Sequence, residues 1–224
     1  MKLYICIRLF VTIRERILKR VGNLMRLLLI RHGESEADLL NVHEGRANFS
    51  LTDQGRKQAQ QMADWVSKNY TIDKLYSSSL NRALETATYL ANLINQTIII
   101  EDELMEFNNG LLAGLNREEA REKYPIDPNL PIHEANYQME SNLAFRFRAE
   151  KILAKIIHES KDQKTVAIVS HGGMISRLYQ AFLKLPVDSE VTIRTGDTGI
   201  HEWIIDENKR QIVFANNLSH LANN

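Results

Sequence analysis

Two short apolar runs, each followed closely by a histidine and a glycine, constrain this chain more than any other feature. The run 26–30 precedes His32 and Gly33, and the run 165–169 precedes His171 and Gly172. Short runs of Leu, Ile and Val are typical of strands that are buried on both faces of a sheet. Ligands of open α/β sheets bind beyond the carboxyl ends of the strands. The pattern therefore predicts a sheet that presents two histidines at one ligand-binding edge.

Extended and helical segments alternate along most of the chain. Strands are expected at 26–30, 72–76, 97–100 and 165–169, with a hairpin at 199–205 and 211–215 around Glu207 and Asn208. Helices are expected at about 53–68, 80–94 and 142–159, in a short segment between Asn116 and Pro125, and from Gly173 to about residue 183. Residues 34–50 read as a polar loop, and Ser77, Ser78 and Ser79 as a helix cap. The alternation predicts an α/β protein, a three-layer α/β/α sandwich around a mostly parallel central sheet.

Charge is distributed unevenly between the first 24 residues and the rest. The whole chain has 224 residues with 28 Lys and Arg against 28 Asp and Glu. Residues 1–24 hold six basic residues and one acidic residue, a net charge of +5, so the other 200 residues carry 22 basic and 27 acidic groups, a net charge of −5. An acidic domain at 25–224 is a poor nucleic-acid binder, and we expect no nucleic-acid partner.

The basic segment 1–24 reads as an extension in front of that domain. Its apolar stretch is interrupted by Arg8 and is far too short to span a bilayer, so no stable membrane insertion is expected. A helix with Phe10, Ile13, Ile17 and Val21 on one face would let it rest on an anionic membrane surface. The favoured interpretation is a dispensable appendage, or a start codon assigned upstream of a natural start at Met25.

Cysteine content points to the compartment. Cys6 is the single cysteine, so no intramolecular disulfide can form. This composition fits a reducing compartment, and we expect a cytoplasmic protein.

An arginine at the start of an expected helix adds to the two histidines. Arg82 follows the three serines at 77–79 and lies near the beginning of the helix at 80–94. Its planar guanidinium matches the geometry of phosphate oxygens. Glycines after each histidine let the backbone approach a bound anion, and the helix that begins after His171 supplies N–H donors. Alone, Arg82 reads equally well as a solvated helix residue.

Six segments carry a family resemblance. They read, in order, LLLIRHGESEA, EGRANFSLTDQGRKQA, LYSSSLNRALETA, LMEFNNGLLAGLNREEAREKYP, VAIVSHGGMISRL and NNLSHL. Together they resemble the histidine phosphatase superfamily, which comprises the cofactor-dependent phosphoglycerate mutases and their phosphatase relatives. The resemblance covers Met25 to about Leu221 and implies a phosphoglycerate mutase-like fold.

The resemblance also implies catalytic roles. His32 matches the family's nucleophile, Arg31 and Arg82 match its phosphate-binding arginines, and His171 matches its second histidine. Glu106 matches the acid that protonates the leaving oxygen and later activates water. The glycines at 110 and 114 fit the family's spacing and select this glutamate from its acidic neighbours.

Further residues are expected to border the substrate. Ser35, Glu44 and Gly45 fall in loops that contact substrate in the family, and Gly172 follows the second histidine. The family often has asparagine where Asp38 stands here. Segment 106–137 matches the family least closely and is expected to select the substrate. The resemblance implies neither a metal nor a cofactor.

The resemblance implies a phosphatase that hydrolyses a phosphate monoester, on a small molecule, through a phosphohistidine at His32. Three alternatives stay open: a phosphoglycerate mutase, a protein phosphatase, and a non-enzymatic binding protein on the same scaffold. The brief, acidic stretch before Ser141 favours a hydrolase over a mutase, which needs extra basic residues to hold its substrate. The sequence fixes neither the substrate nor the oligomeric state.

Overall fold

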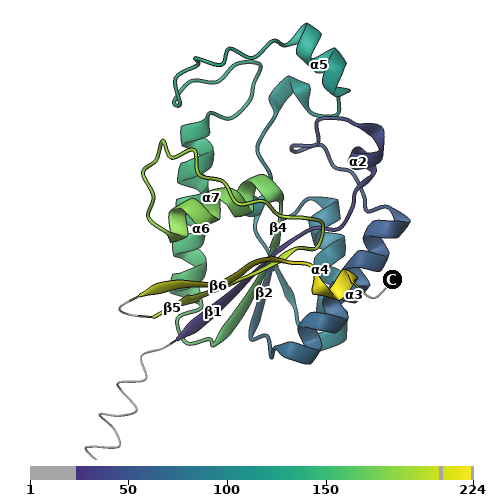
Figure 1. The fold of residues 1–224 in the computed structure, drawn as a ribbon, viewed down its shortest axis with the longest axis vertical. Helices are drawn as coiled ribbons and strands as arrows, with labels where there is room; N and C mark the ends of the chain where they lie inside the picture. Colours follow the sequence, from purple (N-terminus) through teal and green to yellow (C-terminus); the bar gives the residue numbers. More distant parts are fainter. Residues whose placement is uncertain (1–23, 207–208, 223–224) are drawn as a thin grey trace, which may run out of the picture.

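A six-stranded sheet forms the centre of the protein in a computed structural model that describes residues 24–206 and 209–222 (Figure 1). Its strands are β1 (Met25–Arg31), β2 (Lys74–Ser77), β3 (Ile98–Ile100), β4 (Thr165–Ser170), β5 (Ile200–Ile205) and β6 (Arg210–Asn217). They lie in the order β3-β2-β4-β1-β5-β6. The first four in that order are parallel, while β5 and β6 run antiparallel to their neighbours.

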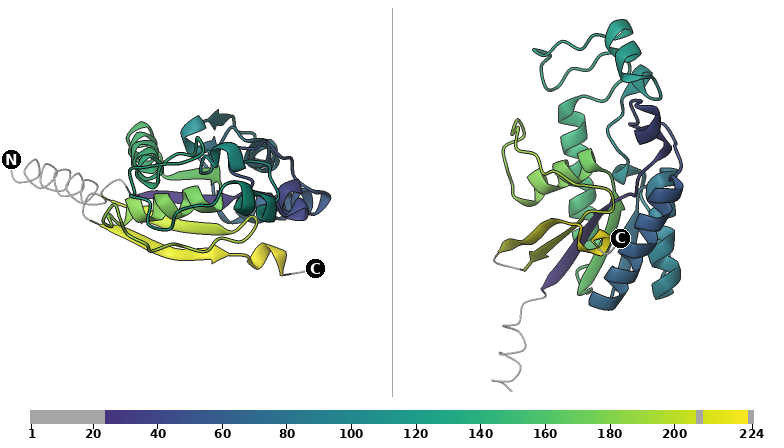
Figure 2. Two further views of the ribbon diagram at one scale, coloured as in Figure 1. Left: turned by 90° about the horizontal axis from the view of Figure 1, so that it is seen from above. Right: turned by 45° about the vertical axis from the view of Figure 1, so that its right-hand side comes forward.

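Helices cover both faces of this sheet. The helices are α2 (Glu36–Leu40), α3 (Asp53–Asn69), α4 (Asn81–Ile94), α5 (Arg117–Lys123), α6 (Asn142–Glu159) and α7 (Gly172–Phe182), with 3₁₀ turns η1 (Asp102–Leu104), η2 (Gly110–Leu112) and η3 (Ser219–Leu221). Helices α3 and α4 lie on one face, and α6 and α7 on the other (Figure 2). The predicted three-layer α/β/α sandwich with a mostly parallel sheet is therefore confirmed.

Strand β1 shows why the run before His32 is apolar at every position. Leu27 and Leu29 pack against α6 and α7, and Leu28 and Ile30 pack against α3 and α4. All four side chains are fully buried, and each contributes about 1.5–3 kcal/mol of apolar burial. A strand with a helical layer on each face has no solvent side, so its side chains do not alternate with polar ones.

The register of β1 and β4 brings the two histidines together. Arg31 lies opposite Ser170, and the amide of His32 donates to the carbonyl oxygen of Ser170 at 3.0 Å. Each histidine is the residue that follows its strand, so both side chains leave the sheet at the same edge. The predicted strand-end position of His32 and His171 is confirmed.

Two local predictions were wrong. The expected polar loop at 34–50 contains the helix α2, which is a turn and a half long and too short to show a helical repeat of apolar residues. The serines at 77–79 do not cap α4: its N-cap is Leu80, without a side-chain cap. The Ser78 hydroxyl instead accepts a bond from the Leu80 amide at 3.3 Å and contacts His171.

Several sequence predictions fall outside the described residues. These are the helix with Phe10, Ile13, Ile17 and Val21, the position of Cys6, and the turn at Glu207 and Asn208. The two strands of the predicted hairpin are described, and they pair as expected. Over the described ranges, none of the helices is long and apolar enough to cross a bilayer.

Candidate active site

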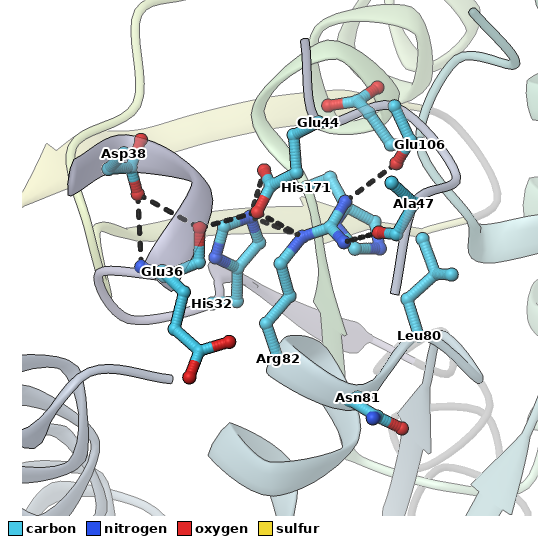
Figure 3. A network of polar contacts seen from close by, with 12 residues as sticks. His32, Glu36, Asp38, Glu44, Ala47, Leu80, Asn81, Arg82, Glu106 and His171 are labelled. Atoms are coloured by element: carbon cyan, nitrogen blue, oxygen red, sulfur yellow. Dashed lines mark hydrogen bonds and ion pairs between the residues drawn. The ribbon is translucent and has the colours of Figure 1, made fainter. Parts of the chain in front are cut away.

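The site lies beyond the carboxyl ends of β1 and β4 (Figure 3). The rings of His32 and His171 have centroids 5.0 Å apart and are both buried. Helix α4 contributes Arg82, the segment after α2 contributes Glu44, and the segment after η1 contributes Glu106. Residues from five separate parts of the chain therefore meet around one pair of imidazole rings.

Hydrogen bonds fix the protonation of His32. Its Nδ1 lies 2.7 Å from the carbonyl oxygen of Gly33, which can only accept, so Nδ1 carries the proton. Its Nε2 accepts a hydrogen bond from Nε of Arg82 at 3.3 Å. Burial lowers the pKa of His32 well below 6.5, and the positive charges of Arg82 and Arg31 lower it further. The ring is therefore neutral, with the lone pair of Nε2 directed into the site.

Arg82 is held rigidly although it is a charged side chain without solvent exposure. Its terminal nitrogens donate to the carbonyl oxygens of Ala47 at 3.0 Å and Gly45 at 2.8 Å. Gly45 adopts a φ of +49°, and a Cβ there would lie 2.7 Å from the side-chain nitrogen Nδ2 of Asn109. Glycine at this position thus lets the loop turn its carbonyl toward the guanidinium. The conformation of Gly45 therefore supplies a hydrogen-bond acceptor that holds the Arg82 guanidinium.

Arg31 approaches the site from the other side. It donates to the carbonyl oxygen of Thr195 at 2.9 Å and forms an ion pair with Asp197 at 3.2 Å. Its aliphatic stem runs beside the first residue of α7, because a Cβ on Gly172 would lie 3.8 Å from Cδ of Arg31. Arg31 and the N-terminus of α7 therefore lie side by side next to the two histidines.

The two ring nitrogens of His171 differ in their hydrogen bonding. Its Nε2 lies 2.8 Å from the hydroxyl of Ser78. Its Nδ1 is buried and has no hydrogen-bond partner among the described residues. Burial lowers the pKa of His171 well below 6.5, with Arg82 and His32 acting in the same direction. A buried unpaired nitrogen costs free energy unless a ligand satisfies it, so this atom is placed to contact a bound oxygen.

Backbone amides fix the carboxylate of Glu106. One oxygen accepts from the amide of Phe107 at 2.8 Å, and the other accepts from the amide of Gly173 at 2.8 Å. Arg148 holds the preceding chain by donating to the carbonyl oxygens of Met105 at 2.6 Å and Glu106 at 3.1 Å. The carboxylate therefore sits at the N-terminus of α7, one residue from Gly172.

Glu44, expected only to border the substrate, lies beside His32 and Arg82. One carboxylate oxygen is 3.1 Å from Nε of Arg82, and the other is 3.8 Å from Nε2 of His32. The Ser35 hydroxyl lies 2.5 Å from Glu44 and is itself buried. Burial raises the pKa of Glu44, partly offset by Arg82.

All predicted site residues gather at this edge: Arg31, His32, Ser35, Glu44, Gly45, Arg82, Glu106, His171 and Gly172. Sequence reasoning missed Ser78, the amide of Gly173, and Asp197. Ser78 was assigned to a cap, and the role of an amide leaves no trace in residue type. Asp197 follows no apolar run or motif that would single it out.

Comparison with known proteins gives the family. The sequence profile of the histidine phosphatase superfamily (branch 1) matches residues 27–218. The chain belongs to this family. The match spans both histidine motifs and the segment that contains Glu106, so the predicted resemblance is confirmed.

Individual relatives of this histidine phosphatase cover most of its length. Phosphoserine phosphatase 1 of Hydrogenobacter thermophilus is 29% identical over 203 residues, which is 89% of this chain and 95% of the relative. The 2,3-bisphosphoglycerate-dependent phosphoglycerate mutase of Cytophaga hutchinsonii is 32% identical over 186 residues, or 79% and 87% of the two chains. The crystal structure of the alpha-ribazole phosphatase from Shigella flexneri superimposes with a TM-score of 0.80 at 26% identity, covering 87% of this chain and 97% of that one. The predicted class, an enzyme of the phosphatase type, is confirmed.

Proposed function

We propose that this histidine phosphatase hydrolyses a phosphate monoester of a small molecule through a phosphohistidine on Nε2 of His32. The observation that carries the proposal is the orientation of the His32 ring. A proton held on Nδ1 by the carbonyl of Gly33 leaves Nε2 unprotonated beside Arg82, with the lone pair that a nucleophile needs. Residues 25–224 form the proposed catalytic domain, and 1–24 its extension.

In the first step Nε2 of His32 attacks phosphorus, and the bond from phosphorus to the ester oxygen breaks. Arg31, Arg82 and Nδ1 of His171 surround the phosphoryl oxygens, whose charge they stabilise. Glu106, protonated at this stage, gives its proton to the departing alkoxide and becomes a carboxylate. The products are an alcohol and phosphohistidine.

In the second step water replaces the alcohol. The Glu106 carboxylate takes a proton from water, whose oxygen attacks phosphorus while the bond to Nε2 breaks. Inorganic phosphate leaves, and His32 and Glu106 return to their starting protonation. The amides of Phe107 and Gly173 donate to one oxygen each, and such donors stabilise the carboxylate that takes the proton from water.

The substrate is proposed to be small because the reacting atoms are buried. His32, His171 and Arg82 each expose about one per cent of their surface or less. Relatives are named for phosphoserine, glucosyl-3-phosphoglycerate and alpha-ribazole phosphate, all small phosphate esters. No nucleic-acid partner is proposed, and the single cysteine supports a cytoplasmic site of action.

Phosphoglycerate mutase activity is the second candidate, because one relative with this name is 32% identical. A mutase holds the substrate carboxylate with basic side chains. The first basic residues that follow Glu106 in the sequence are Arg117, Arg121 and Lys123. They lie on the exposed helix α5, at the far end of the molecule from the sheet (Figure 1). Transfer to water is therefore favoured over transfer to a second hydroxyl.

A phosphate-release assay on a panel of phosphate esters, without added metal, tests the proposal. We expect release that disappears in His32→Ala and persists in His133→Ala, a histidine whose side chain is 65% exposed. Rapid quenching at alkaline pH, followed by mass spectrometry, should find the added phosphoryl group on the peptide that contains His32. Interconversion of phosphoglycerates without phosphate release would support the mutase, and neither activity would support a binding protein.

A further inference from the structure

A carboxylate occupies the place where the proposed function puts the phosphoryl group. Glu44 contacts Nε of Arg82 at 3.1 Å and approaches Nε2 of His32 to 3.8 Å, the two atoms assigned to binding and attacking phosphorus (Figure 3). A phosphate ester that reaches Nε2 of His32 must therefore lie against Glu44. Two anions at contact distance repel each other strongly in a buried site.

Glu44 is fixed there by a chain of polar contacts. The Ser35 hydroxyl lies 2.5 Å from the Glu44 carboxylate and 3.2 Å from the Asp38 carboxylate. Asp38 also accepts a bond from the Ser35 amide at 3.0 Å, which anchors it at the start of α2. One hydroxyl proton cannot satisfy two carboxylates at once. A proton on Glu44 would complete the chain, with Glu44 donating to Ser35 and Ser35 donating to Asp38.

The charges that face Glu44 do not favour a second full anion. Arg82 and Arg31 are the nearby cations, Asp38 is a nearby carboxylate, and the His32 ring is neutral. Arg31 is already paired with Asp197. Burial raises the pKa of Glu44, and Asp38 acts in the same direction against Arg82, the Ser35 hydrogen bond and Arg31. A dianionic phosphate would raise it further.

We infer that Glu44 determines the protonation state in which the substrate binds, by sharing one proton with a phosphoryl oxygen in the complex. The site then accepts the monoanion of the phosphate ester beside the Glu44 carboxylate, or the dianion beside the protonated Glu44 carboxyl. These two complexes hold the same number of protons. The inference rests on the proposed function, since it takes Arg82 and His32 as the phosphate-binding pair. It makes Glu44 a specificity-determining residue that excludes a fully ionised complex.

Proton uptake is the direct consequence. Phosphate esters lose their second proton near pH 6, so above about pH 7 the free ester is a dianion, and Glu44 is taken as a carboxylate in the free enzyme. Binding must then take one proton from solution, and affinity falls as the pH rises. A site with only Arg82 and Arg31 facing the phosphate would bind the dianion without uptake.

Isothermal titration calorimetry with inorganic phosphate measures this uptake. Binding enthalpies in buffers of different ionisation enthalpy, at about pH 8 where phosphate is mainly a dianion, give the number of protons taken up. We expect about one proton per bound phosphate for the wild type and none for Glu44→Gln, which should bind phosphate about tenfold more tightly or better. Glu36→Gln is the matched control, because Glu36 lies on α2, shortly before Glu44 in the chain, and its carboxylate points away from Arg82 (Figure 3).

Each outcome decides the inference. Equal uptake in the wild type and Glu44→Gln, or weaker phosphate binding by Glu44→Gln with its melting temperature unchanged, would overturn it. Glu44→Asp withdraws the carboxylate by one methylene and should give intermediate affinity if Glu44→Gln fails to fold. Wild-type enzyme that binds phosphate without uptake would refute the inference alone, whereas wild-type enzyme that neither binds phosphate nor hydrolyses any ester would refute the proposed function as well.

Discussion

Gly173 and Glu106 are in direct contact: the Gly173 amide donates to one carboxylate oxygen at 2.8 Å, and a Cβ at residue 173 would lie against the other. The distance from that Cβ to the Glu106 oxygen is 2.4 Å, closer than any stable contact. The general acid of the proposed reaction therefore depends on the absence of a side chain one residue into α7.

Gly173→Ala should move the acid without harming the fold. The displaced group is the end of a flexible side chain, and alanine stabilises a helix by about 1 kcal/mol relative to glycine. We expect a melting temperature equal to or above that of the wild type, with turnover of poor leaving groups reduced about a hundredfold and good leaving groups affected much less. Gly172→Ala, whose Cβ meets only Arg31 at 3.8 Å, should leave the ratio between the two rates unchanged. An equal loss for all leaving groups in Gly173→Ala would contradict this assignment of the acid.

Arg82→Lys tests whether the guanidinium shape matters beyond its charge. A lysine cannot reach His32 and the carbonyls of Gly45 and Ala47 together, so at least one buried carbonyl loses its partner. The free energy of unfolding should fall by about 1–3 kcal/mol, and kcat/KM should fall about a hundredfold or more. Urea denaturation and steady-state kinetics measure the two effects. Arg56→Lys, a partly exposed arginine on α3, should change neither.

Arg148→Lys tests the support behind Glu106. The Arg148 guanidinium joins the Glu140 carboxylate, at 2.6 Å, to the carbonyl oxygens of Met105 and Glu106. Lysine would loosen this segment, so kcat for poor leaving groups should fall about tenfold while inorganic phosphate still inhibits with the wild-type constant. Arg177→Lys, whose guanidinium donates to Asn142 at the start of α6 and not to Glu106, is the control. A change in phosphate inhibition alone would show that Arg148 acts on binding and not through Glu106.

Acid should destabilise the protein through its buried histidines. Burial lowers the pKa of His201 and His220 to about 4, and lowers those of His32 and His171 well below 6.5. Between about pH 6.5 and 4 the unfolded chain binds protons that the folded chain excludes, so the free energy of unfolding falls with decreasing pH, by about 1.4 kcal/mol per unit for each such histidine. Above about pH 6.5 the effect vanishes, because both states are neutral.

Urea denaturation at a series of pH values checks this slope. In His201→Gln the dependence on pH should be shallower than in the wild type, since one excluded proton is lost. The exposed His133 provides the control, as His133→Gln should retain the wild-type slope. Comparing slopes, and not absolute stabilities, removes the contribution of carboxylates that titrate in the same range. Identical slopes in all three proteins would refute the role of His201.

The sequence predicted the layers, and it predicted which residues gather at the candidate site, because both depend on residue type. The unbroken apolar runs identify β1 and β4, and motif order identifies Glu106 among several neighbouring acids. Strand order, by contrast, depends on contacts between distant segments that leave no local pattern. The contact between Glu106 and the Gly173 amide was not predicted for the same reason. Ser78 was misassigned because a serine before a helix usually caps it, and here its hydroxyl contacts His171 instead.

The position of β1 also has a consequence for biosynthesis. This strand is the first described element of the chain, yet its partners in the sheet are β4 and β5, which begin at Thr165 and Ile200. A ribosome that adds about 5–20 residues per second therefore leaves this strongly apolar segment without its neighbours for on the order of ten seconds. Nascent chains must be kept from associating through it during that time. The proposed site is complete only after His171 has emerged, so a chain that terminates before that residue contains His32 without its partner histidine.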